Sequence, residues 1–191
     1  MPSTFGYGSR EAREQLSDAA LAERAIDGDL AAFETLLRRH TPLMRSLVAR
    51  MLRSVSDADD VVQDALILAW RQLSSLQEPA SVRAWLMTIA SRQALSRMRR
   101  RPADLALSDG SVAEERSAEP ERVATHNAQL RSLADALDTL TEDQRQCWLL
   151  REIAELSYEQ IGTELDMSPS TVRGKLARAR AHVVARMEGW R

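Results

Sequence analysis

Two helix-start signals stand close together near the C-terminal end of the chain and restrict how this segment can fold. Ser157 is followed three residues later by Gln160, the spacing of a capping box, in which two side chains satisfy free amide groups of a helix start. Ser168 is a favourable N-cap, and Pro169 takes the first helical position, where its missing amide proton costs nothing. Residues 166–167 form the turn between them. The pattern predicts a helix–turn–helix that begins at Ser157.

The second of these helices combines an apolar side with a cationic side. Its apolar residues recur at spacings of four, three and four, at Val172, Leu176, Ala179 and Val183. Its other side carries Arg173, Lys175, Arg178 and Arg180, and no acidic residue lies between Ser168 and Ala181. Such a helix suits the major groove of DNA, where phosphates attract the charge and arginine pairs with guanine. A solvated basic face on an ordinary core helix is the alternative.

The composition favours helices along the whole chain. Hydrophobic residues make up 44% of the 191 residues, while Gly (7) and Pro (6) are scarce and alternation of β-branched residues is hard to find. This length allows one large domain or two small ones. We expect an all-α protein of two small helical domains joined by a flexible acidic linker, the second domain containing the helix–turn–helix.

Several kinds of site and location are not expected. Cys147 is the only cysteine, His40, His126 and His182 are scattered, and no Cys/His cluster has zinc spacing, so we expect no disulfide, metal or cofactor. The N-terminus lacks the apolar run of a signal peptide, and no later run is long enough to span a bilayer. We therefore expect a soluble, cytoplasmic protein without membrane insertion.

The net charge of −2 conceals blocks of opposite sign. Residues 83–101 contain six arginines and no acid, whereas residues 102–122 contain six acids and two arginines together with Pro, Gly, Ser and Ala. The acidic block offers no sustained apolar period, which is typical of a linker. We expect a flexible N-terminus over residues 1–16, a helical domain over 17–101, the linker over 102–122 and a second helical domain over 123–191.

The first domain contains an amphipathic helix with an unusual outer face. Gly28–Asp29 and Thr41–Pro42 interrupt the preceding residues, which predicts two or three helices there. In the segment Asp57–Trp70 we expect the inward positions to be Val62, Leu66, Ala69, Trp70 and, beyond it, Leu73. The opposite side gathers Asp60, Gln63, Asp64, Ile67 and Arg71. An isoleucine among carboxylates and an amide indicates a protein-docking surface; a solvated acidic face with one incidental apolar residue is the alternative.

The next helix becomes increasingly basic towards its end. Ser81 can cap it, and Trp85, Leu86 and Ile89 form its apolar stripe. Arginines gather in its last turns, where the negative end of the helix dipole stabilises them and where they can contact a nucleic-acid backbone. Trp85 is either a stacking platform for an unpaired base or a core residue.

Together these segments resemble the extracytoplasmic-function (ECF) sigma factors, the small promoter-specificity subunits of bacterial RNA polymerase. Residues 57–70 resemble the region-two helix that docks on the β′ clamp coiled coil, and residues 82–90 with the following arginines resemble the helix that reads and opens the downstream promoter element. Residues 140–153, 157–161 and 170–180 resemble region four, which binds the upstream element and the β flap. The motifs occur in the family's order and cover nearly the whole chain.

The resemblance assigns site residues to three surfaces. For the upstream element they are Ser170, Thr171, Arg173, Lys175, Arg178 and Arg180. For the downstream element they are Trp85, Arg92, Gln93, Ser96, Arg97 and Arg100. For the polymerase they are Asp60, Gln63, Asp64, Ile67 and Arg71. The expected partners are RNA polymerase core through its β′ clamp and β flap, promoter DNA and an anti-sigma factor.

The chain departs from the family pattern at four of its positions. Arg92 and Ser96 stand where many members have Asn and Asp, which leaves the downstream base preference open. Gly174 and Ala177 replace larger or polar residues in the recognition helix. Glycine within a helix costs about 1 kcal/mol relative to alanine, which a close approach of backbone to DNA would explain; a plain surface glycine is the alternative.

These observations predict a sigma factor that binds core polymerase, directs it to two promoter elements and assists strand separation. No nucleophile–base pair, phosphate-binding glycine loop or paired carboxylate pocket occurs, so we expect no enzymatic activity. An ordinary helix–turn–helix regulator explains the C-terminal half equally well, but gives no reason for residues 57–70 or for the second cationic helix. A helical adaptor that binds only protein is a third hypothesis. We expect no added C-terminal sensory domain.

Overall fold

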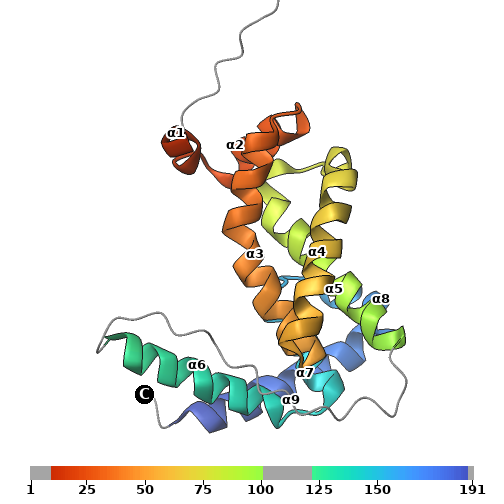
Figure 1. Ribbon diagram of the computed structural model, residues 1–191. Helices are drawn as coiled ribbons and strands as arrows, with labels where there is room; N and C mark the ends of the chain where they lie inside the picture. The colour runs from red at the N-terminus through yellow and green to blue at the C-terminus, as the bar shows by residue number, and fades with distance from the viewer. Residues whose placement is uncertain (1–9, 101–121, 189–191) are drawn as a thin grey trace, which may run out of the picture.

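The computed structural model describes residues 10–100 and 122–188 of the chain, and these residues form two groups of α-helices (Figure 1). The N-terminal group consists of α1 (Arg10–Glu14), α2 (Asp18–Ile26), α3 (Leu30–Leu52), α4 (Val55–Gln72), the 3₁₀ turns η1 (Leu73–Ser75) and η2 (Pro79–Ser81), and α5 (Val82–Arg100). The C-terminal group consists of α6 (Arg122–Asp138), α7 (Glu142–Glu152), α8 (Tyr158–Leu165) and α9 (Pro169–Met187).

The all-α prediction is confirmed, with no strand anywhere in the two described ranges. Helices α2 to α5 pack side by side, and the second group lies across one end of this bundle (Figure 1). Most of the expected linker lies outside the described residues, so the domain boundaries stay predictions. Within the segment 1–16, for which flexibility was expected, Arg10–Glu14 forms a short helix.

Helix α3 is longer than the sequence indicated. Gly28, with a φ of 95°, ends α2, and the Asp29 side chain then caps α3 by accepting from the amide of Ala32. Thr41–Pro42 was expected to break the helix, and this prediction is wrong, because α3 runs through Pro42. Eleven buried residues along its length hold α3 against its neighbours, and this packing outweighs the hydrogen bond that a proline removes.

A cluster of polar side chains ties the first two helices to the middle of α3. Arg39 donates to the main-chain oxygens of Glu14 and Leu16 and, at 2.7 Å, to Asp18, while His40 Nε2 lies 2.8 Å from the other Asp18 oxygen. Burial raises the pKa of the Asp18 carboxyl, but Arg39 and His40 more than offset this effect and hold the pKa below its ordinary value. His40 therefore has a structural role.

The helix–turn–helix is confirmed, and its two caps are where the sequence predicted them. Ser157 and Gln160 form a reciprocal capping box at the start of α8, and Ser168 caps α9 with Pro169 in the first turn. Asp166 ends α8 in the left-handed conformation, with a φ of 54°. The turn packs so tightly that a Cβ atom at Gly162 would lie 2.5 Å from the carbonyl oxygen of Met167.

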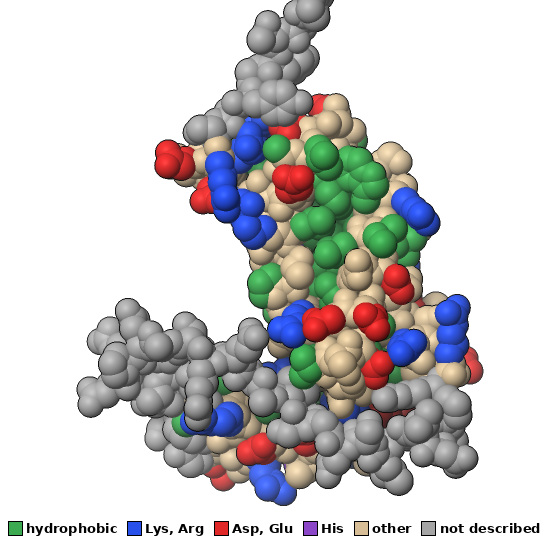
Figure 2. Space-filling view, in the orientation of Figure 1, with side chains coloured by type: hydrophobic (Ala, Val, Ile, Leu, Met, Phe, Trp, Pro, Cys, Tyr) green, Lys and Arg blue, Asp and Glu red, His purple; other side chains and the backbone are tan. Residues whose placement is uncertain are grey.

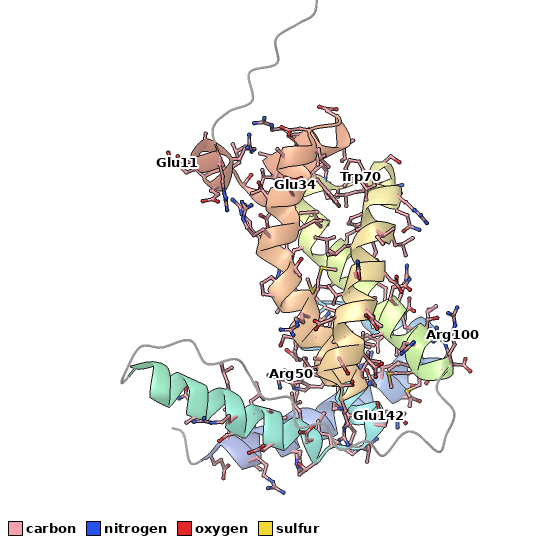
Figure 3. The ribbon with its side chains drawn as sticks, viewed as in Figure 1. Glu11, Glu34, Arg50, Trp70, Arg100 and Glu142 are labelled. Atoms are coloured by element: carbon pink, nitrogen blue, oxygen red, sulfur yellow. The ribbon has the colours of Figure 1, made fainter. Side chains whose placement is uncertain are left out.

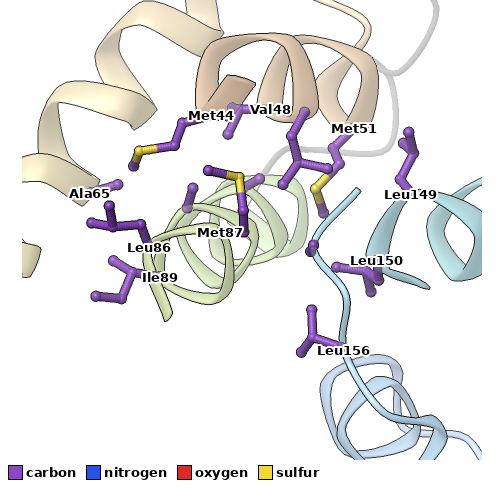
Figure 4. Close-up of a cluster of buried hydrophobic side chains, with 14 of the residues drawn as sticks. Met44, Val48, Met51, Ala65, Leu86, Met87, Ile89, Leu149, Leu150 and Leu156 are labelled. Carbon is purple, nitrogen blue, oxygen red and sulfur yellow. The ribbon is translucent and has the colours of Figure 1, made fainter. Parts of the chain in front are cut away.

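The two helical groups share a buried junction. Figure 4 shows Met51 of α3 and Met87 of α5 beside Leu149, Leu150 and Leu156 of the C-terminal group, and all five side chains are buried in one continuous core. Burying apolar side chains from both groups contributes favourably to their association. The described groups are therefore packed on one another.

We predict that Gly162→Ala destabilises the C-terminal group by about 1–3 kcal/mol, because the added methyl overlaps a main-chain oxygen that cannot move independently. Gly174→Ala in α9 is the matched control, since the nearest atoms to its Cβ would be Arg178 side-chain nitrogens at 3.8 and 3.9 Å. We expect it to be neutral or to add up to about 1 kcal/mol. Urea unfolding followed by circular dichroism measures both variants. Equal stability of the two would contradict the close approach at Gly162.

Candidate DNA-binding and polymerase-binding surfaces

Helix α9 presents the amphipathic face that the sequence predicted. Its buried residues are Val172, Leu176, Ala179 and Val183. Ser170 and Thr171 are exposed in the first turn, where their hydroxyls lie within 2.9 Å of the Ser168 hydroxyl. These two exposed residues lie at the N-terminal end of the helix, where an anion is favoured.

The four cations of α9 differ in whether they already form an ion pair with an acidic side chain. Lys175 is only 22% exposed and donates to Asp143 of α7 at 2.7 Å, and Arg180 donates to Glu152 at 2.7 and 3.0 Å. Arg173 and Arg178 are exposed, and no ion pair to another described residue is found for either one. Arg173 and Arg178 are therefore available to a ligand without breaking an ion pair.

Tyr158, the first residue of α8, lies against two of the surrounding arginines. The guanidinium groups of Arg151 and Arg173 lie 5.4 and 5.8 Å from the centre of its ring, within cation–π range. Sequence reasoning missed this role, although an aromatic residue directly after the Ser157 cap was visible. The ring therefore contacts an arginine of α9 that was assigned to DNA.

The residues assigned to the downstream element lie along α5 but are not equally accessible. Arg92 and Arg97 are exposed although each is paired, Arg92 with Glu164 of α8 at 2.6 Å and Arg97 with Asp57 of α4 at 2.9 Å. The remaining members differ in burial: Arg100 is exposed, whereas Trp85, Gln93 and Ser96 are half-buried. Trp85 packs against the core with part of its surface, so both of its proposed roles stay open. The expected Ser81 cap is replaced by η2, which runs directly into α5.

Helix α4 displays the predicted polar set on its outer side. Asp60, Gln63, Asp64, Ile67 and Arg71 are all exposed, and Ile67 keeps 47% of its surface in solvent. We call these five residues the α4 face. An exposed isoleucine beside two carboxylates can bury apolar surface against a partner and pair with its cations.

The helical periodicity of α4 gave a wrong prediction for one residue. Trp70 was expected to point inwards, but it is 46% exposed, and its ring lies against that of Phe33 with 5.0 Å between the ring centres. The inward positions are taken by small residues such as Ala65 and Ala69, which let α4 approach its neighbours closely. Trp70 and Arg100 lie at opposite ends of the N-terminal group (Figure 3).

Trp70 extends the α4 face into a larger apolar surface. Ile26 at the end of α2 and Leu30 at the start of α3 are also exposed, and Figure 2 shows hydrophobic side chains gathered over α3 and α4. Sequence reasoning missed these two residues because they lie next to the Gly28 turn rather than on a periodic face. A patch of this kind is typical of an interaction site.

The described residues contain no group of three or more side chains suited to hold a metal ion. Burial raises the pKa of the Cys147 thiol to about 11, so the thiol is neutral at physiological pH and is not an activated nucleophile. His182 contacts Thr139 at 2.7 Å, and His126 lies outside the side chains that the structure describes. None of the helices in the described ranges is both long and apolar enough to cross a bilayer.

Both helical groups match known families of transcription proteins. A sigma-70 region 2 model matches residues 36–102, and a sigma-70 region 4 model matches residues 130–183. The chain is 35% identical over 179 residues to the ECF RNA polymerase sigma-E factor of Escherichia coli (strain K12), a match that covers 87% of this chain and 92% of that protein. The Haemophilus influenzae sigma-E factor is 35% identical over 183 residues, covering 87% and 93%.

The chain belongs to the ECF sigma factor family.

As an ECF sigma factor it directs promoter-specific transcription, and sigma factors in general are not enzymes. The hypothesis of an unrelated regulator is less supported, because the matches cover both helical groups rather than the helix–turn–helix alone.

Two solved structures are similar to this chain. A structure of CnrH in complex with the cytosolic domain of CnrY has a TM-score of 0.57 and 26% identity, covering 90% of this chain and 97% of that chain. A structure of the sigma factor RpoE in complex with the anti-sigma factor NepR from Bartonella quintana has a TM-score of 0.58 and 27% identity, covering 82% and 96%.

We predict that Tyr158→Leu weakens promoter binding by the complex of this ECF sigma factor with core polymerase, by about 2- to 5-fold, because Arg173 loses its aromatic support. Tyr158→Phe is the matched control, since it keeps the ring and removes only the hydroxyl. The measurement is retention of promoter DNA by the complex as salt is varied. A Phe variant as impaired as the Leu variant would show that the hydroxyl, not the stacking, matters.

Proposed function

We propose that α9 binds the upstream promoter element in the major groove, that α5 binds the downstream element, and that the α4 face docks on the β′ clamp coiled coil of RNA polymerase. The single observation that carries this proposal is that two of the four cations of α9 pair with acids of α7, whereas the other two have no ion pair to a described residue. Two of them hold the helix in its domain and two remain for DNA.

Upstream recognition depends on Arg173 and Arg178 in particular. Both are exposed outside the buried stripe of α9, and neither must exchange an ion pair among the described residues before it binds. Ser170 and Thr171 would contribute hydrogen bonds to phosphate from the first turn. Lys175 and Arg180 act mainly by holding α9 against α7, through Asp143 and Glu152, and contribute to the electrostatic attraction of DNA.

The downstream element would meet a face of α5 on which Arg92, Ser96 and Trp85 are close in helical position. Arginine contacts phosphate, and the tryptophan edge that remains exposed can support an unstacked base. Gln93, Arg97 and Arg100 extend this surface towards α4 and the helix end. This arrangement supports strand separation, because unpaired bases are bound by stacking and charge rather than by a groove.

Polymerase docking would use the α4 face together with Ile26, Leu30 and Trp70. The combination of exposed apolar side chains with carboxylates favours a partner helix that carries arginines and apolar residues. The β flap is proposed to contact the C-terminal group. The chain would act stoichiometrically in the cytoplasm, without a cofactor or an enzymatic activity of its own.

An anti-sigma factor is proposed as a further partner. The CnrH and RpoE structures that this chain resembles are complexes, and the RpoE partner is an anti-sigma factor. A protein that covered the α4 face would block polymerase binding by competition.

We predict that Arg178→Ala reduces promoter binding by the polymerase complex, by about 10-fold if the guanidinium makes a bidentate base contact, since such contacts are worth roughly 1–3 kcal/mol. Arg186→Ala is the matched control, because Arg186 is exposed in the last turn of the same helix and beyond the basic face. In vitro transcription with purified core enzyme measures both. Unchanged promoter-specific transcription by the Arg178 variant would refute the assignment of this residue.

We predict that Ile67→Asp abolishes co-elution with core polymerase, because a buried, unpaired carboxylate at the centre of the contact is strongly unfavourable. Val184→Asp in α9 is the control, since Val184 is similarly exposed, at 50%, and lies far from α4. Gel filtration with core enzyme at moderate salt measures binding. Equal co-elution of the two variants would exclude the α4 face as the docking site.

A further inference from the structure

Gly174, in the interior of α9, leaves room for the side chain of Arg178. A Cβ atom at Gly174 would lie 3.8 and 3.9 Å from the two terminal nitrogens of the Arg178 guanidinium. Side chains of an α-helix lean towards its N-terminus, so a residue meets the one four positions before it on the same face. The guanidinium of Arg178 therefore lies along the surface of α9, beside the bare backbone of residue 174.

The fold of the C-terminal group does not itself require glycine at position 174. Gly174 is helical and lacks the positive φ that is found at Gly28. It also lacks the close backbone contact of Gly162, where a Cβ atom would overlap the carbonyl oxygen of Met167. Within a helix, glycine is less stable than alanine. What the missing side chain changes is therefore the space that is available to Arg178.

The two unpaired arginines of α9 have different surroundings. The guanidinium of Arg173 lies 5.8 Å from the ring of Tyr158, which belongs to α8. The guanidinium of Arg178 lies against α9 itself, and no ion pair to another described residue holds it elsewhere. The position of the Arg178 guanidinium therefore depends on the residue that stands four places before it.

A low profile on this side of α9 suits the reading of a base edge. Ala177 and Ala181 are exposed, small and on the same side of the helix as Gly174. An arginine that extends straight outwards would hold the helix away from the floor of the major groove by the length of its side chain. A guanidinium that lies along the helix presents its donors close to the backbone, so α9 can approach the base pairs.

We propose that Gly174 determines specificity at the upstream element, because its missing side chain lets the Arg178 guanidinium lie flat on α9 and pair with both acceptors of one guanine. The proposal rests on the proposed function of α9. Gly174 is a positioning residue that acts through Arg178. Alanine fits at this position, since its Cβ atom would make an ordinary van der Waals contact, whereas a longer side chain competes with the guanidinium for the same space.

Gly174→Leu tests this arrangement, and Gly174→Ala is the conservative variant. The probe is a library of randomised duplex DNA, from which the complex of the full chain with core polymerase retains preferred sequences. The base pair read by Arg178 is the one whose preference Arg178→Ala abolishes. We expect Gly174→Leu to reduce the preference for guanine at this pair by about 10-fold, the size of one lost bidentate contact. We expect Gly174→Ala to keep the preference within about 2-fold of wild type, since alanine leaves the guanidinium in place.

Two controls separate positioning from other effects of a larger side chain. Ala181→Leu adds the same side chain to an exposed position from which Arg178 leans away, and we expect no change in preference. In the double variant of Gly174→Leu with Arg178→Ala, we expect no loss beyond that of Arg178→Ala alone. Urea unfolding should show Gly174→Leu to be at least as stable as wild type, because leucine is the better helix former. A loss of preference without a loss of stability is not the result of a structural role.

A guanine preference that Gly174→Leu leaves unchanged would overturn the inference. So would a further loss in the double variant, which would show that leucine clashes with DNA directly, or equal losses in Gly174→Ala and Gly174→Leu. A wild-type complex that retains no preferred sequence, or an Arg178→Ala variant with the wild-type preference, would refute the proposed function of α9 instead.

Discussion

A guanidinium group that already has a carboxylate partner must exchange that partner before it can bind a phosphate. This constraint separates the cations that have a carboxylate partner from those that do not, which says more about DNA binding than the number of cations does. In α9 it separates Arg173 and Arg178, which are free of ion pairs to described residues, from Lys175 and Arg180, which brace the helix against α7. In α5 it ties Arg92 and Arg97 to acids.

The carboxylates that make these pairs have two different effects. Asp143 and Glu152 belong to the same helical group as α9, so the pairs that they form persist when the groups separate. Glu164 pairs across the junction with α5, so its pair exists only while the groups are docked. A pair within a group is a fixed support for a DNA-binding helix, whereas a pair across the junction depends on the arrangement of the groups.

The sequence predicted features that depend on interactions between neighbouring residues and missed features that depend on distant ones. The caps at Ser157 and Ser168 depend on amide groups two or three residues away, and both were predicted correctly. The family, the all-α fold and the sigma factor function were also correct. Pro42 and Trp70 were misjudged, because the packing of other helices decides whether a proline is tolerated and which side of α4 is buried.

The requirement for Gly162 was equally hidden, since it comes from the carbonyl oxygen of Met167 across a folded turn. The site residues were predicted from charge, helical position and the family resemblance, and these stay predictions. Their partners could not be read from the sequence at all: Glu164 is seventy-two positions from Arg92, and nothing local indicates the pair.

The junction between the groups combines exposed ion pairs, buried polar atoms and apolar contacts. Exposed ion pairs contribute about 0–1 kcal/mol each. Leaving a buried polar atom such as Arg145 Nε or Gln146 Oε1 without a partner costs about 1–3 kcal/mol. These opposing contributions are of similar size, so the apolar contacts of Met51 with Leu149 and Leu150 decide the balance.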